Sequence, residues 1–187
     1  MVLSLPNVLT LSRIVAIPAV VALFFVPGPA AQWAAGVVFV AAAVTDFFDG
    51  WLARRWQQVS HFGRFLDPIA DKLMVAAVLM MLVGAGRVAT VTTLPALVIL
   101  GREILVSGLR EYLAQLNVGM PVTGLAKWKT GIQMVAITIL LVGDAGPVLP
   151  WVVIGEAGLW IAGVLTLITG WDYMRAGLAH MRAADRA

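Results

Sequence analysis

Long stretches without any charged residue are the feature that most constrains this chain. The longest runs from Ile14 to Thr45, and Pro27, Gly28 and Pro29 interrupt it near its middle. Because about 20 apolar helical residues cross the hydrocarbon core of a bilayer, each half of this stretch approaches the length needed to span it. The stretch therefore predicts a hairpin of two transmembrane helices.

Four further apolar stretches follow, and turn-forming residues separate them. They cover residues 63–84, 88–115, 124–142 and 149–175. The chain has 61% hydrophobic and 12% charged residues, whereas a typical soluble domain has roughly 25% charged residues. The sequence predicts an all-α integral membrane protein, with residues 1–187 forming a single domain of six transmembrane helices.

The basic residues are distributed unevenly if six helices place both termini on one side of the membrane. Of the 13 Lys and Arg residues, only Arg87 then lies on the opposite side. The positive-inside rule makes the side rich in basic residues cytoplasmic, so we expect both termini there. These residues form no continuous basic stripe, so nucleic acid is not an expected partner.

Four carboxylates are expected to meet near the cytoplasmic side. Asp46 and Asp49 are three residues apart on the second predicted helix, and Asp67 and Asp71 are four apart on the third, so each pair shares one helix face. The two pairs lie at similar depths from the helix ends. Carboxylates inside a membrane need cations or water, and a chain without Cys favours hard cations such as Mg²⁺ or Mn²⁺. A pair of divalent cations is the simplest solution.

Two other interpretations use the same carboxylates. In the first, they form ion pairs near the interface with Arg54, Arg64 and Lys72. In the second, they mark the ion pathway of a divalent-cation or proton-coupled transporter, although the outer half of the predicted bundle has almost no charged positions to complete such a pathway.

Residues 46–71 resemble a known signature. They match D-x2-D-G-x2-A-R-x8-G-x3-D-x3-D, the signature of the CDP-alcohol phosphatidyltransferases, at all eight fixed positions. Outside it, four segments are similar to the bacterial phosphatidylglycerophosphate synthases of this family: Leu5 to Arg13, Gly101 to Glu103, Leu109 to Glu111 and Lys127 to Thr130. The resemblance covers nearly the whole chain.

The resemblance implies a fold, a location and a reaction. The chain is expected to have the CDP-alcohol phosphatidyltransferase fold in a bacterial cytoplasmic (inner) membrane, with its active site facing the cytoplasm. It would transfer the phosphatidyl group from CDP-diacylglycerol to sn-glycerol 3-phosphate, giving phosphatidylglycerophosphate and CMP, with two divalent cations, Mg²⁺ or Mn²⁺. The family also implies a homodimer. Inositol phosphate, serine and phosphatidylglycerol are alternative acceptors within the family.

The resemblance also assigns roles to residues. It implies that Asp46, Asp49, Asp67 and Asp71 are metal ligands and that Asp71 is the general base. Residues expected to bind CDP-diacylglycerol are Asn7, Thr10, Gly50, Ala53, Arg54 and Gly63. For the phosphate of the acceptor we expect Arg102, Arg110, Lys127 and Lys129, because guanidinium and ammonium groups suit phosphate. Helix capping is an equal alternative for Asn7 and Thr10, and membrane anchoring for some of the basic residues.

Overall fold

The computed structural model describes residues 5–55, 61–115, 118–119 and 124–184, apart from the side chains of 5–7, 47–54, 61, 62, 64 and 182–184. The described residues form six long helices and no strand, which confirms the all-α prediction. The long helices are α1 (Leu5–Leu23), α2 (Pro29–Arg55), α3 (His61–Gly84), α4 (Thr93–Gln115), α5 (Gly124–Val142) and α6 (Trp151–Ala184). Two short 3-10 helices, η1 (Thr90–Thr92) and η2 (Gly143–Ala145), precede α4 and α6.

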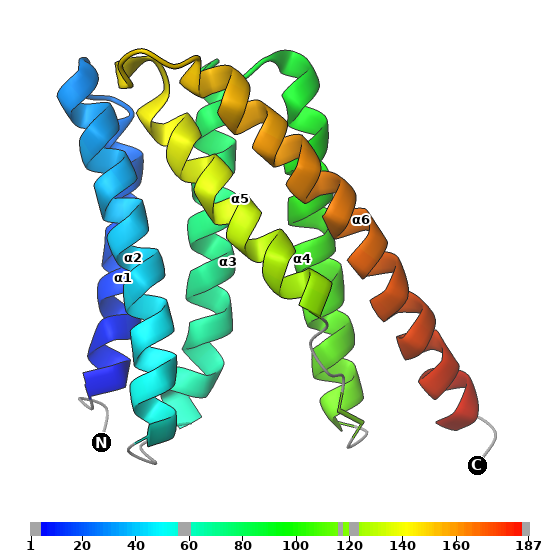
Figure 1. Ribbon diagram of the computed structural model, residues 1–187. Helices are drawn as coiled ribbons and strands as arrows, with labels where there is room; N and C mark the ends of the chain where they lie inside the picture. The colour runs from blue at the N-terminus through cyan, green and yellow to red at the C-terminus, as the bar shows by residue number, and fades with distance from the viewer. Residues whose placement is uncertain (1–4, 56–60, 116–117, 120–123, 185–187) are drawn as a thin grey trace.

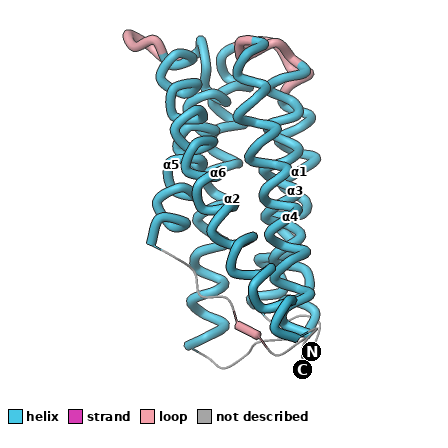
Figure 2. The backbone as a smooth tube through the Cα atoms, turned by 90° about the vertical axis from the view of Figure 1, so that its right-hand side faces the viewer, coloured by secondary structure: helices cyan, strands magenta, loops and turns pink. Residues whose placement is uncertain are grey.

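The helices run alternately up and down, so that α1 begins and α6 ends at the same end of the bundle (Figure 1). The connections from α1 to α2, from α3 to α4 and from α5 to α6 lie at the opposite end (Figure 2). We call the end that holds the termini the terminal end and the other the loop end.

Glycine and proline explain the breaks at the loop end. Gly28 adopts a φ of 108°, a conformation that L side chains rarely adopt. Pro29 then opens α2, where its missing N–H costs no helical hydrogen bond. After α3, Gly86 takes a φ of 65°, and the Gly86 N–H donates to the carbonyl of Val83 at 3.1 Å. The predicted break at Pro27 to Pro29 is therefore confirmed.

Helix α1 packs against both α2 and α3, whereas α5 and α4 pack mainly against α6. Small residues allow α6 to cross its neighbours closely. A Cβ on Gly158 would lie 2.9 Å from Ala136 Cβ of α5, and one on Gly163 would lie 2.8 Å from Pro95 Cβ of α4. Close helix contact through small residues is typical of membrane bundles. Helix α2 also contacts α5 and so joins the two groups of helices.

The surface of the bundle has the character of a membrane protein. Four stretches are long and apolar enough to cross a bilayer: Pro29–Asp46, Thr90–Gln115, Gly124–Ala145 and Trp151–Met181. The apolar part of α1, Val8–Leu23, is shorter, and α3 carries Asp67, Asp71 and Lys72 in its first half. Large apolar side chains face outwards on several helices, as Ile104 does with 72% of its surface exposed. Such surfaces suit lipid rather than water.

Candidate active site

Helices α1, α2 and α3 bring three of the four predicted carboxylates into one region. Thr10 Oγ1, on α1, donates a hydrogen bond to Asp67 Oδ1 on α3 at 2.5 Å. Arg13 Nη1, three residues further along α1, forms an ion pair with Asp46 Oδ1 on α2 at 2.7 Å. Because residues three apart share a helix face, α1 directs both groups towards the carboxylates. Asp71 lies one turn beyond Asp67 and lines a cavity together with Asp46.

Arg13 was not among the predicted site residues, because the sequence suggested only a contribution to the positive cytoplasmic face. Its side chain is only 1% exposed, whereas that of Asp46 is 41% exposed. A buried guanidinium needs a carboxylate partner, since desolvating an isolated charge is costly. The signal that could have revealed Arg13 is its position one helical turn from Thr10.

The cavity lined by Asp46 and Asp71, which we call the inner cavity, has a volume of about 190 Å³. Four helices line it. Its polar lining consists of Asp46 from α2, Asp71 and Lys72 from α3, Glu103 from α4, and Thr130 and Gln133 from α5. A second cavity of about 390 Å³, the outer cavity, lies between α3 and α4. Its polar lining consists of Lys72, Arg102, Glu103, Ser107, Arg110 and Glu111. Lys72 and Glu103 line both cavities, so the two spaces adjoin.

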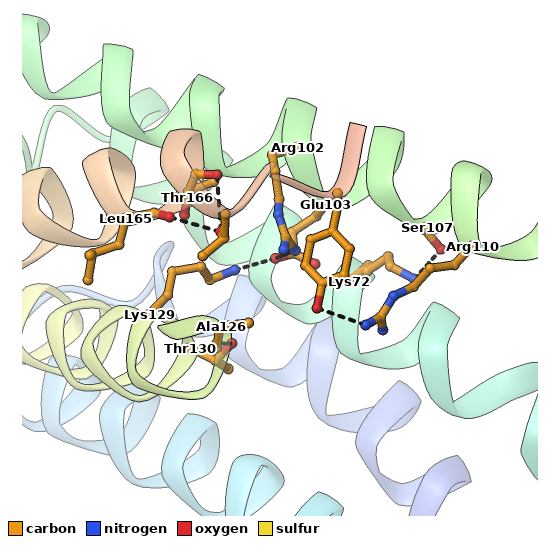
Figure 3. Close-up of polar contacts among 12 residues, drawn as sticks. Lys72, Arg102, Glu103, Ser107, Arg110, Ala126, Lys129, Thr130, Leu165 and Thr166 are labelled. Atoms are coloured by element: carbon orange, nitrogen blue, oxygen red, sulfur yellow. Dashed lines mark hydrogen bonds and ion pairs between the residues drawn. The ribbon is translucent and has the colours of Figure 1, made fainter. Parts of the chain in front are cut away.

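Glu103 organises the basic side chains near the wall shared by the cavities (Figure 3). Its Oε1 accepts a hydrogen bond from Lys129 Nζ at 2.5 Å and contacts Arg102 Nη1 at 3.3 Å. Lys129 is 2% exposed, so Glu103 neutralises a buried ammonium group. Lys72 Nζ donates to Ser107 Oγ at 2.6 Å, which connects α3 to α4. Neither Lys72 nor Ser107 was singled out as a site residue from the sequence.

Tyr173 of α6 positions the two arginines of the outer cavity. Arg110 Nη2 donates to Tyr173 Oη at 3.1 Å, and the guanidinium carbons of Arg110 and Arg102 lie 5.0 Å and 5.3 Å from the centre of its ring. Cations over an aromatic face are attracted to it. A Cβ on Gly170 would lie 2.9 Å from Arg102 Cγ, so glycine leaves room for this side chain. The Nε atoms of both arginines are buried and have no hydrogen-bond partner among the described residues.

The other predicted residues fall into two groups. Gly63 is buried in α3, whereas Lys127 is exposed and borders an apolar groove between α5 and α6, away from both cavities. The remaining five lie outside the described side chains, namely Asn7, Asp49, Gly50, Ala53 and Arg54. The structure therefore brings Arg102, Arg110 and Lys129 together but does not bring Lys127 to them.

The carboxylates provide a donor set suited to hard divalent cations. Asp46, Asp67 and Asp71 outnumber the described basic residues beside them, Arg13 and Lys72, so the described part of this region carries excess negative charge. Among the described residues, no three carboxylate or imidazole groups form a cluster that could hold a metal ion. The side chain of Asp49, the fourth predicted ligand, lies outside the described set. Among the described residues, Lys72 does not form the ion pair expected as an alternative and instead donates a hydrogen bond to Ser107.

The arrangement places a carboxylate-rich cavity beside a cavity that holds two arginines. The first can attract divalent cations together with a diphosphate, and the second can bind a phosphate through guanidinium groups. Because Lys72 and Glu103 line both, the two cavities lie next to each other. This geometry suits the transfer of a phosphorus group between two bound substrates.

Comparison with known proteins identifies relatives of the whole chain. The model of the CDP-alcohol phosphatidyltransferase family matches residues 3–168. A protein of Rickettsia bellii named CDP-diacylglycerol–glycerol-3-phosphate 3-phosphatidyltransferase is 48% identical over 92% of this chain and 94% of its own. Proteins with the same name from Pseudomonas fluorescens and Cereibacter sphaeroides are 44% identical over 98% of this chain and 42% identical over 96%, respectively. These matches cover 95% and 97% of the relatives.

Proposed function

The chain belongs to the CDP-alcohol phosphatidyltransferase family, and from this premise we propose that it transfers the phosphatidyl group of CDP-diacylglycerol to sn-glycerol 3-phosphate. The products are phosphatidylglycerophosphate and CMP. The names of relatives at 42–48% identity give the same donor and acceptor. The reaction is a step towards phosphatidylglycerol and cardiolipin.

The observation that carries this proposal is the pair of adjoining cavities with opposite charge. An acceptor that bears its own phosphate needs fixed cations, and Arg102 and Arg110 line the outer cavity. Its attacking hydroxyl must reach the donor beside Asp46 and Asp71 in the inner cavity. Serine has no phosphate and would leave Arg110, whose partner is the Tyr173 hydroxyl, without an anionic group to bind. The paired cavities therefore favour a phosphorylated acceptor.

In the proposed reaction, Asp71 accepts the proton of the primary hydroxyl of sn-glycerol 3-phosphate as its oxygen bonds to phosphorus. The bond between this phosphorus and the bridging oxygen breaks, and the electron pair leaves with CMP. Arg102 and Arg110 bind the phosphate of the acceptor. Lys129 neutralises Glu103 and thereby fixes the position of this side chain between the two cavities. Donor binding involves Asn7, Thr10, Gly50, Ala53, Arg54 and Gly63.

Two divalent cations, Mg²⁺ or Mn²⁺, complete the proposed site. Asp46, Asp49, Asp67 and Asp71 would hold them, because carboxylate oxygens suit these hard ions. When bound, such ions polarise the attacked phosphoryl group and neutralise charge on the leaving nucleotide. Thr10 and Arg13 support this role, since their bonds to Asp67 and Asp46 fix the direction of two carboxylates.

The proposal includes the membrane topology and the assembly. We place six membrane-crossing helices in a bacterial inner membrane, with both termini and the active site on the cytoplasmic side, and we expect a homodimer. The common position of the termini at one end of the bundle supports this topology (Figure 1). The distribution of the 13 Lys and Arg residues also supports it, because only Arg87 is expected at the loop end and the positive-inside rule makes the other end cytoplasmic. Because the chain lacks Cys, the topology can be tested with the single-cysteine variants Val148→Cys and Ala179→Cys and a thiol reagent that does not cross membranes. We expect the reagent to label position 148 from outside the cell and position 179 only from the cytoplasmic side.

The proposed activity is tested by release of CMP from CDP-diacylglycerol in detergent with Mg²⁺. sn-Glycerol 3-phosphate is compared with inositol 1-phosphate, serine and phosphatidylglycerol. We expect release with sn-glycerol 3-phosphate and none from Asp71→Asn, which serves as the matched control. Release with another acceptor alone would overturn the acceptor assignment. Folded protein that releases no CMP with any acceptor would contradict the proposed activity.

A further inference from the structure

Gln133 is a buried polar residue of the inner cavity that the proposed reaction does not yet use. It lies on α5, one turn beyond Lys129, and is 2% exposed. The cavity that it lines also contains Asp46 and Asp71. Its Oε1 atom is buried and has no hydrogen-bond partner among the described residues.

A buried amide oxygen without a partner is unusual, because such groups are generally satisfied. The neighbouring polar groups on α4 and α5 are engaged elsewhere. Lys129 Nζ binds Glu103, and Thr130 Oγ1 donates to the carbonyl of Ala126 at 3.0 Å. The Gln133 oxygen therefore remains available to a hydrogen-bond donor that enters the inner cavity.

The hydrogen-bond donors that a glycerol phosphate acceptor carries are its hydroxyl groups. Phosphate and diphosphate oxygens at neutral pH mainly accept hydrogen bonds, so they do not satisfy an amide oxygen. The attacking hydroxyl of a glycerol phosphate must approach Asp71, which lines the same small cavity. The second hydroxyl is on the adjacent carbon and therefore enters the cavity with it.

We propose that Gln133 is a specificity-determining residue that accepts a hydrogen bond from the acceptor hydroxyl next to the attacking one. This inference rests on the proposed function, because it takes a glycerol phosphate as the acceptor. With the phosphate of the acceptor at Arg102 and Arg110 in the outer cavity, the carbon chain has to extend past Lys72 and Glu103, which line both cavities, to reach Gln133. Gln133 then selects a diol over an acceptor with a single hydroxyl group.

The test compares sn-glycerol 3-phosphate with 3-hydroxypropyl phosphate, which lacks the second hydroxyl. We expect the native enzyme to prefer sn-glycerol 3-phosphate by about tenfold in kcat/KM, as the loss of one hydrogen bond to a buried group predicts. Gln133→Met keeps the length of the side chain but removes its polar atoms. It should abolish this preference while turnover of 3-hydroxypropyl phosphate changes little. Met134→Leu, which alters an apolar residue of the same cavity, should keep the native preference.

A second comparison tests the other possible source of the hydroxyl, the ribose of the donor. CDP-diacylglycerol is compared with its 2′-deoxycytidine analogue, and we expect the native preference between them to be unchanged in Gln133→Met. A change confined to this donor series would overturn the assignment to the acceptor. Equal acceptor preference in native protein and Gln133→Met would also overturn it.

Folding and activity are separated within the same experiment. Turnover of 3-hydroxypropyl phosphate reports a folded active site in each variant. If Gln133→Met does not fold, Gln133→Asn, which withdraws the amide by one methylene, should likewise reduce the acceptor preference, and an unchanged preference would contradict the inference. Native protein that does not use sn-glycerol 3-phosphate would instead refute the proposed function.

Discussion

The buried contact between Arg13 and Asp46 gives a prediction whose size follows from the structure. Arg13→Met keeps much of the aliphatic volume but leaves Asp46 without this ion pair. Removing one partner of a fully buried pair costs about 3–5 kcal/mol. Asp46 is 41% exposed, so water stabilises the remaining carboxylate and the expected cost falls to about 1–2 kcal/mol. For a chain of this size, that corresponds to a melting temperature about 2–8 °C lower.

The assay is thermal unfolding in detergent, followed by the fluorescence of the seven tryptophans. A double-mutant cycle with Asp46→Asn separates the ion pair from other effects of each substitution. If the ion pair stabilises the fold, the free energy of unfolding should fall less in the double variant Arg13→Met/Asp46→Asn than the sum of the losses in the two single variants. Additive losses, or a melting temperature of Arg13→Met equal to the native one, would refute the reasoning. CMP release should also fall in Arg13→Met, because Asp46 loses its orientation.

Three further predictions concern the cavities. Asp67→Asn or Asp71→Asn should lower CMP release at least about 100-fold while the melting temperature stays near the native one, and retained activity in purified Asp67→Asn would contradict the two-cation site. Arg110→Lys should raise the KM for sn-glycerol 3-phosphate by about tenfold with a smaller change in kcat, because lysine lacks the planar donors that reach phosphate and Tyr173. An unchanged KM would assign Arg110 a purely structural role. Chelation by EDTA should abolish CMP release and added Mg²⁺ or Mn²⁺ should restore it, whereas release that persists in EDTA would exclude the proposed metal dependence.

The helix boundaries followed closely from the sequence, because local signals determine them. The stretch predicted to cover residues 63–84 forms α3, which begins at His61 and ends at Gly84, and the stretch 124–142 coincides with α5. The last predicted stretch ended at residue 175, whereas α6 continues to Ala184. The stretch predicted from residue 88 also differs, since α4 begins at Thr93 after η1. There, the Ala89 N–H donates to a carboxylate oxygen of Glu156 on α6, a contact that no local pattern reveals.

The direction in which each polar side chain faces was harder to predict. Most faces of these helices are apolar, so periodicity does not distinguish the lipid side from the bundle interior. Arg13 was interpreted as part of the positive cytoplasmic face, but the packing of α1 against α2 and α3 buries it. Lys127 and Lys129 show where spacing does help. Residues two apart point to nearly opposite sides of a helix, and accordingly Lys127 is exposed whereas Lys129 is buried.

The pairing of charges around Glu103 suggests how the site separates its two tasks. Lys129 contributes little net attraction for a phosphate, because its ammonium group lies 2.5 Å from Glu103 Oε1. Arg102 shares the same carboxylate oxygen at the longer distance of 3.3 Å, and Arg110 is held by the neutral Tyr173. The positive charge offered to an acceptor is therefore concentrated in the outer cavity, on Arg102, Arg110 and Lys72. Lys129 instead neutralises Glu103, so that carboxylate would compete less with Asp46 and Asp71 for the proposed divalent cations.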